Sequence, residues 1–196
     1  MTEIPGHLVP LPGADTLDDV YCVSFVRNLT PDEVLRRFGV DEDTLEEVAF
    51  DDLGERSIDT MREDAAGFIG ATKAGDWTVV VEPGGWQLAV DPDVYGPVSQ
   101  GTEVVSICRH DYASDSFAYI VDGTPVVAFD PRHPELPSGA DADRFAAEMR
   151  ATGLVPGGEI DRPIERAFAL AERITGLPFS AGLLAQPFLG AETLDD

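Results

Sequence analysis

Three consecutive strand-like segments constrain the fold of this chain more than any other feature. They span residues 103–109, 116–121 and 124–129, and β-branched and aromatic residues are frequent in them. Only Asp122 and Gly123 separate the last two, and this dipeptide is typical of two-residue hairpin turns. Because consecutive hairpins pair antiparallel strands, a doubly wound parallel sheet is excluded as the simplest architecture.

Further strands are predicted upstream of this meander. Residues 20–26 are rich in β-branched and aromatic side chains, and residues 67–72 and 77–82 flank a short glycine-containing connection that suits a hairpin. Residues 86–90 are expected to add a short strand before a connection over residues 92–101.

The clearest helix start is at Thr30. This residue is the expected N-cap, Pro31 fits the first helical position, and Glu33 is expected to close a capping box. Gly39 should end this helix.

Helical periodicity returns near the C-terminus. It predicts helices over residues 141–152 and 162–175, ended by Gly153 and Gly176, and a short helix over residues 180–185. The expected fold is α+β, with an antiparallel sheet of about five to seven strands and helices packed on one face. Residues 1–17 are expected to form an extended lead-in, and residues 18–190 a single domain.

The net charge of −24, from 37 acidic and 13 basic residues, limits the possible partners. Nucleic-acid binding through a cationic surface is excluded, because that mode depends on Lys and Arg neutralising phosphates. Anionic membranes are disfavoured for the same reason, and a basic protein would be attracted. Acidity that only maintains solubility is the alternative. No secretory signal or long apolar run occurs, so a cytoplasmic protein without a membrane partner is expected.

Much of the acidity is concentrated between residues 41 and 64, where a short helix and a loop are expected. Apolar residues interrupt the acids, which indicates a face that packs on the body of the protein. The spacing lacks the glycine and glutamate of an EF-hand, so a solvated charged face is favoured over a cation site. The candidate binding residues here are Asp41, Asp43, Glu46, Glu47, Asp51 and Asp52.

A second candidate site is the string Arg109, His110 and Asp111 at the end of a strand. A histidine between an arginine and an aspartate has the chemistry of a general base or an anion anchor. Against this, adjacent residues of a strand point to opposite faces, so Arg109 and His110 share a site only if the strand bulges. The alternative is that these residues cap strand ends and hydrogen-bond the turn.

Motifs for common chemistries are absent from the sequence. It contains no phosphate-binding loop, dinucleotide fingerprint, nucleophile elbow or zinc-protease motif. No catalytic residue, cofactor or metal is therefore assigned. Cys22 and Cys108 are expected to be buried free thiols, which could form a disulfide only if their strands are neighbours. Trp86, after a Pro-Gly-Gly turn, suits either core packing or an interface.

Three stretches of the sequence, residues 21–39, 75–86 and 104–130, resemble an uncharacterised actinobacterial family, a domain of unknown function. The resemblance covers residues 18–190. It implies a source in a high-GC actinobacterium and a cytoplasmic setting, and it transfers no catalytic residue.

Three functions remain open from the sequence, the last of which is a purely structural subunit of a larger assembly. The first is a non-enzymatic protein-binding module, similar to an immunity or escort protein for a basic partner, which binds through the acidic segment and Trp86. The alternative is a small-molecule-binding or catalytic domain with a pocket near Arg109, His110 and Asp111.

Overall fold

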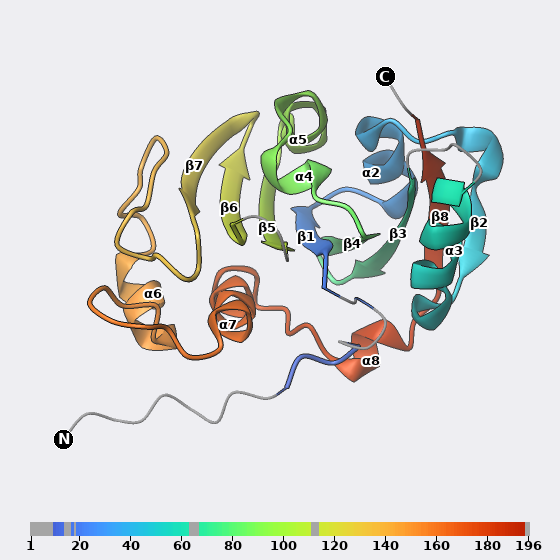
Figure 1. Ribbon diagram of the computed structural model, residues 1–196. Helices are drawn as coiled ribbons and strands as arrows, with labels where there is room; N and C mark the ends of the chain where they lie inside the picture. The colour runs from blue at the N-terminus through green and yellow to red at the C-terminus, as the bar shows by residue number, and fades with distance from the viewer. Residues whose placement is uncertain (1–9, 14–16, 18, 63–66, 111–113, 195–196) are drawn as a thin grey trace.

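The computed structural model of the chain is built around one antiparallel sheet (Figure 1). It describes residues 10–13, 17, 19–62, 67–110 and 114–194. Its strands are β1 (Tyr21–Arg27), β2 (Glu46–Val48), β3 (Gly67–Ala74), β4 (Trp77–Pro83), β5 (Glu103–Arg109), β6 (Ser116–Val121), β7 (Thr124–Phe129) and β8 (Phe188–Thr193). Their spatial order is β2-β8-β3-β4-β1-β5-β6-β7. The α+β class is confirmed, with eight strands instead of five to seven.

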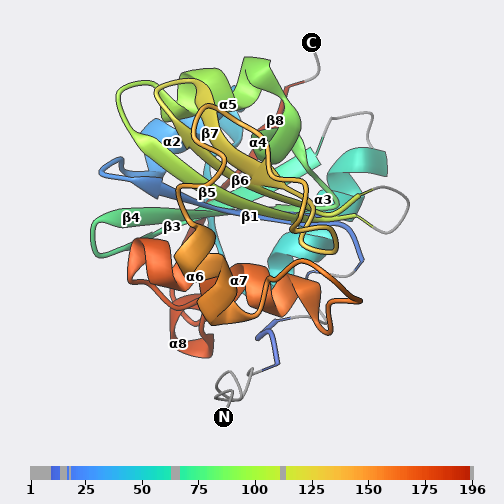
Figure 2. The same ribbon diagram turned by 90° about the vertical axis from the view of Figure 1, so that its left-hand side faces the viewer.

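Helices cover both faces of the sheet, so the prediction that they pack on one face was wrong. They are α2 (Pro31–Phe38), α3 (Phe50–Arg62), α4 (Gln87–Val90), α5 (Pro92–Ser99), α6 (Ala146–Thr152), α7 (Pro163–Thr175) and α8 (Ala181–Leu184), with a 3₁₀ turn η1 (Glu42–Thr44). Figure 2 shows α2, α4 and α5 on one side of the sheet and α6, α7 and α8 on the other.

Alternation along the central strand explains this three-layer arrangement. In β1, Val23 and Phe25 pack with α3, α6 and α7, whereas Cys22 and Val26 pack with α2, α4 and α5. Successive side chains of a strand point to opposite faces. A central strand that is apolar at both parities therefore needs cover on both sides, and β1 is buried along all but its last residue.

The predicted hairpins are confirmed. β3 pairs with β4, and β5, β6 and β7 form the meander. Asp122 and Gly123 adopt φ values of 48° and 75°, the left-handed pair that a tight hairpin turn requires.

The prediction of a strand over residues 86–90 was wrong. Trp86, Leu88 and Val90 alternate as in a strand, yet Gln87–Val90 form α4 and Pro92–Ser99 form α5. The Glu82 carboxyl accepts the backbone N–H groups of Gln87 and Leu88 and so satisfies the start of α4. This long-range contact outweighs the local pattern.

The helix after Thr30 is confirmed, but its capping box is not formed. Thr30 makes no side-chain cap hydrogen bond, and Glu33 pairs instead with Arg36 and Arg37. Charged partners one turn away compete with a neutral N–H, and charge-assisted hydrogen bonds are the stronger ones. Gly39 ends the helix with φ of 94°, as expected.

Residues 41–62 hold more regular structure than a short helix and a loop. They form η1, the edge strand β2 and the 13-residue helix α3. β2 pairs with β8, the second strand that the sequence did not predict. Gly190 in β8 lies where a Cβ would approach the Phe68 ring within 2.6 Å, so the strand needs glycine for close packing.

The C-terminal helices follow the prediction with one shift. α6 begins at Ala146 instead of residue 141, whereas α7 and α8 lie within one residue of their expected bounds. The sheet extends to Thr193, three residues beyond the expected end of the domain. Most of the expected lead-in over residues 1–17 lies outside the described residues.

Candidate functional site

The two ends of the central strands differ in chemistry. At one end β1 begins, β4 and β5 finish, and Tyr21 lies opposite both Pro83 and Arg109. We call this the Glu82 end, after the last carboxyl of β4. At the other, the Arg27 end, Arg27 lies opposite Trp77.

Trp86 and His110, both singled out from the sequence, meet at the Glu82 end. Their rings are 5.3 Å apart between centroids and are tilted by 58°. Trp86 precedes α4 and is 46% exposed, whereas His110 follows β5. The contact joins the α4 layer to the end of the meander.

A pocket of about 240 Å³ opens beside Trp86. Its walls include Met61 at the end of α3 and Thr193 at the end of β8, and the carboxyl side chains of Glu82 and Asp91 also line it. The Ser57 hydroxyl donates to the Pro83 carbonyl at 2.8 Å and so ties α3 to the end of β4. Three segments distant in sequence therefore build one concave surface.

Glu82 is the most unusual side chain of this pocket. It is 1% exposed, and its carboxyl accepts hydrogen bonds from Gln87 N at 2.9 Å and Leu88 N at 3.2 Å. Burial raises the pKa of Glu82 well above its ordinary value, the neighbouring Cys22 raises it further, and the two N–H groups oppose the rise. The group is thus held toward its protonated form.

A row of small polar side chains continues from Glu82 across the sheet. Cys22 lies opposite both Glu82 in β4 and Cys108 in β5, so the strands of the two cysteines are neighbours. Both thiols are free and buried, as expected. The Cys22 Sγ lies 3.1 Å from Ser106 Oγ, and Ser24 Oγ donates to Ser106 Oγ at 2.8 Å.

Exposed apolar side chains gather around the mouth of the pocket. Met61 is 45% exposed, and Ile58 lies one turn before it on α3 and is also exposed. We define the Trp86 surface as Met61, Trp86 and Asp91 together with the rest of the pocket lining. Large apolar groups clustered beside a concavity are typical of an interaction site, unlike scattered ones.

The six acids predicted as binding residues are spread along one edge of the molecule. Asp41 caps η1 by accepting from Asp43 N, and Glu46 in β2 pairs with Arg56 of α3. The remaining three, Glu47, Asp51 and Asp52, are exposed. Asp51 and Asp52 begin α3, while Met61 lies near its end. This acidic edge shares α3 with the Trp86 surface and lies outside its pocket lining.

The string after β5 is divided between different contacts. Arg109 pairs with Asp19 at 2.9 Å, the His110 ring contacts that of Trp86 at a tilt, and Asp111 lies outside the described residues. The backbone of His110 donates to Asp115 Oδ1 at 3.1 Å, which matches the expectation that these residues bond to the turn. Arg109 and His110 do not share one site in the described part of the chain.

Asp115 is a second buried acid at this end. Burial raises its pKa, against the opposing effects of the His110 N–H and Arg132. Arg132 Nε lies 2.9 Å from its Oδ2, although that oxygen makes no hydrogen bond within the described residues.

Sequence reasoning missed Glu82, Met61 and Asp91. Glu82 carried a usable signal, because a carboxyl closes an otherwise apolar strand immediately before Pro83. No such sequence signal marks Met61, since its place in the pocket lining depends on how α3 packs.

The described residues form neither a metal cluster nor a membrane-spanning helix. In residues 10–13, 17, 19–62, 67–110 and 114–194, no group of three or more His, Cys, Asp or Glu side chains could hold a metal ion. No helix in these same ranges is both long and apolar enough to cross a bilayer.

Comparisons with known proteins give one match. The model of DUF6461, a family of unknown function, matches residues 13–189. No curated protein matches the chain, and no solved structure does so either.

Proposed function

Because the chain belongs to DUF6461, whose function is unknown, we propose from its geometry that it is a non-enzymatic protein-binding module. It holds a basic partner on the Trp86 surface, as an immunity or escort protein does. The observation that carries the proposal is the exposure of Trp86 and Met61 around one pocket. Tryptophan is among the residues that most often dominate binding energy at interfaces.

Charge supports the basic character of the partner. The protein has a net charge of −24, and acids lie in the first turn of α3, whose last turn contains Met61. Such a field accelerates association with a cationic surface, while the apolar centre slows dissociation. The acidic edge thus steers the partner and the Trp86 surface retains it.

The proposal includes a cytoplasmic setting in an actinobacterium. The composition supports such a source, since Lys73 is the only lysine among 13 basic residues.

Capture of a partner by variants of the immobilised protein tests the proposal. The wild type should retain a stoichiometric basic protein from source lysate at low salt and release it at about 0.5 M salt, where exposed charges are screened. Trp86→Ala should weaken this binding at least about tenfold. Asp52→Lys should slow association with a smaller effect on dissociation.

Leu136→Ala is the matched control, because Leu136 is 71% exposed and lies outside the Trp86 surface. A partner that the control and Trp86→Ala retain equally contradicts the proposal. Self-association of the protein through this surface, detected by sedimentation, contradicts it as well.

A small-molecule-binding or catalytic domain is the second candidate. It is favoured by Asp115, whose buried Oδ2 lies beside Arg132 while its Oδ1 accepts from the His110 N–H. A metabolite screen by thermal shift tests it. A ligand that stabilises the wild type but neither Arg109→Ala nor His110→Ala, with both variants folded, would support this candidate. If these substitutions only unfold the protein, their role is structural.

A further inference from the structure

The pocket of the Trp86 surface has a lining that suits one kind of group. An indole, a thioether and two carboxyl side chains surround it. Among its described lining residues there is no lysine, arginine or histidine. Its volume of about 240 Å³ lies below the roughly 300–1,000 Å³ of typical small-molecule sites. The space therefore fits a single side chain better than a metabolite.

The carboxyl of Glu82 is fixed in this lining by the backbone. The N–H groups of Gln87 and Leu88 hold its two oxygens, and Gly85 leaves room beside it, since a Cβ there would lie 2.9 Å from the Glu82 Cβ. Within the described residues, no basic side chain pairs with Glu82. A buried acid without a cation is costly to ionise, so a cation that enters the pocket gains a preorganised partner.

We propose that this pocket receives one arginine side chain of the basic partner, with the guanidinium between the Trp86 ring and the carboxyls of Glu82 and Asp91. The inference rests on the proposed function and names the group that the surface recognises. Arginine fits better than lysine, because its planar guanidinium stacks on an aromatic face while it donates to carboxylates in its own plane.

Entry of the cation changes the state of Glu82. Burial raises the pKa of this group in the free protein. A guanidinium nearby favours the carboxylate, so binding of the arginine lowers the pKa of Glu82. Asp91 lies at the rim, where its side chain accepts from Asp93 N at 2.9 Å.

Titration with two isosteric probes tests the inference. The probes are N-acetyl-arginine amide and N-acetyl-citrulline amide, which differ in charge and hardly in shape. The indole N–H signal of Trp86 reports binding by NMR, and that of Trp77, at the Arg27 end, serves as an internal reference. The arginine probe should shift the Trp86 signal and bind at least about fivefold more tightly than the citrulline probe.

Two substitutions localise the effect. Glu82→Gln and Asp91→Asn should each weaken the arginine probe about threefold or more and leave the citrulline probe unchanged. Asn at position 91 keeps an acceptor for Asp93 N, so the start of α5 is preserved. Asp93→Asn, which removes one exposed charge outside the pocket lining, should change neither affinity. Circular dichroism confirms that each variant is folded.

Equal binding of the two probes, or arginine binding that is insensitive to both Glu82→Gln and Asp91→Asn, overturns the inference. The proposed function would survive that result, because a basic partner can still bind through the exposed Asp51 and Asp52 of α3 and the apolar side chains of Trp86 and Met61. Conversely, loss of the captured partner from the control Leu136→Ala contradicts the proposed function without affecting the probe titration.

Discussion

The two ends of the sheet differ in how their acids are matched, since Glu103 at the Arg27 end is half-buried and Glu82 at the other end is buried. At the Arg27 end, Glu103 accepts hydrogen bonds from Arg27 and from the Tyr119 hydroxyl. Burial alone raises the pKa of Glu103, but Tyr119 and Arg27 outweigh it, so the pKa is lowered. At the Glu82 end, burial dominates and the pKa is raised. Glu103 has a cationic partner within the fold, Arg27, whereas Glu82 has none among the described residues.

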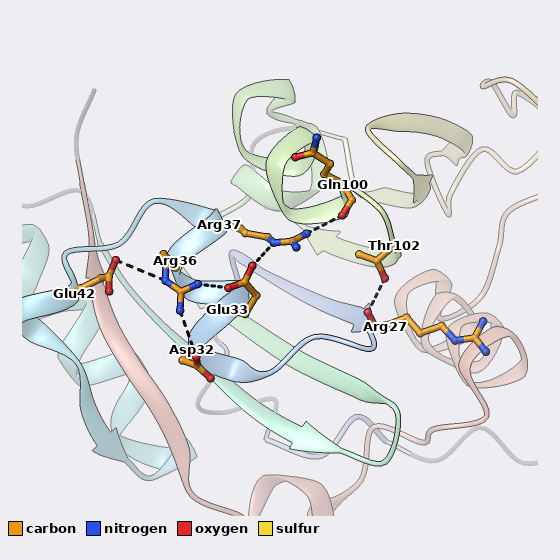
Figure 3. Close-up of polar contacts among 8 residues, drawn as sticks. All are labelled: Arg27, Asp32, Glu33, Arg36, Arg37, Glu42, Gln100 and Thr102. Carbon is orange, nitrogen blue, oxygen red and sulfur yellow. Dashed lines mark hydrogen bonds and ion pairs between the residues drawn. The ribbon is translucent and has the colours of Figure 1, made fainter.

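Arginines extend the matched network over the Arg27 end. Figure 3 shows Arg36 among Asp32, Glu33 and Glu42, and Arg37 between Glu33 and the Gln100 carbonyl. The Thr102 hydroxyl donates to the Arg27 carbonyl at 2.6 Å in the same region. A hollow of about 490 Å³ lies here, and its lining includes the carboxylates of Glu103 and Asp122. Glu103 already pairs with Arg27, and Asp122 Oδ1 accepts from Gly101 N at 2.9 Å.

In an acidic protein, a buried carboxyl locates a partner site better than the acids of the surface do. Acids that are abundant on the surface attract a basic partner from a distance, but they do not locate its binding site. A buried carboxyl without a cation is more informative, because an unmatched buried charge is expensive and is retained for a reason. By this criterion the Glu82 end is the binding end.

Glu103→Gln should have the largest effect on stability. It removes the charge that Arg27 and Tyr119 match, and hydrogen bonds to charged groups are worth about 1.5–3 kcal/mol. Because Arg27 is half exposed, solvent reduces this to about 1–2 kcal/mol at pH 7. Urea unfolding measures the difference. A lowered carboxyl pKa stabilises the fold above about pH 4.3, so the deficit should shrink as pH falls below that value.

Glu82→Gln should show the opposite pH dependence of stability relative to the wild type. The folded state holds the proton of Glu82 more tightly than the unfolded state does, so its stability falls as pH rises above about 4.3. Glutamine does not titrate and so escapes this pH-dependent loss, although its amide keeps only one acceptor for the two N–H groups of Gln87 and Leu88. The variant should gain stability over the wild type as pH increases from 4 to 8, by a few degrees in melting temperature, at about 2–4 °C per kcal/mol.

Glu172→Gln, at an exposed position of α7, corrects both results for the general loss of one negative charge. If Glu82→Gln and Glu103→Gln show the same pH trend after this correction, the contrast between the two ends is wrong.

Arg36→Ala should have the smallest effect. Arg36 contacts three acids, yet it is 48% exposed, and surface ion pairs contribute about 0–1 kcal/mol. We expect a loss below about 1 kcal/mol that disappears near 1 M salt, where the screening length is about 3 Å. A loss of stability that does not depend on salt would indicate that Arg36 contributes through the packing of its aliphatic stem and not through its charge.

Much of the fold was predictable because it depends on local signals. Asp122-Gly123 specifies its hairpin, and Pro31 with Gly39 brackets α2. α4 was missed because its start is satisfied by Glu82, a contact that no local pattern contains. β8 was missed because its sequence signal, Gly190, is explained only by a tertiary contact. The ring of Phe68 lies against this glycine in the folded chain.

Less of the candidate site was predictable. Trp86 and His110 were each singled out, but their contact depends on α4 and β5 meeting at one end of the sheet. The acidic residues were found by composition, which does not distinguish Glu46, already paired with Arg56, from the exposed Asp52. Burial determines which carboxyl has a raised pKa, and burial depends on how the whole chain packs.

Photocross-linking tests the central claim, that the Glu82 end binds the partner, most directly. A photoreactive amino acid is placed at position 61 on the Trp86 surface, and in a matched variant at position 136, both of which are exposed in the fold. The account predicts that a basic protein is cross-linked from position 61 at low salt, lost at high salt, and absent from position 136. Equal cross-linking from both positions, or cross-linking only from position 136, would contradict it.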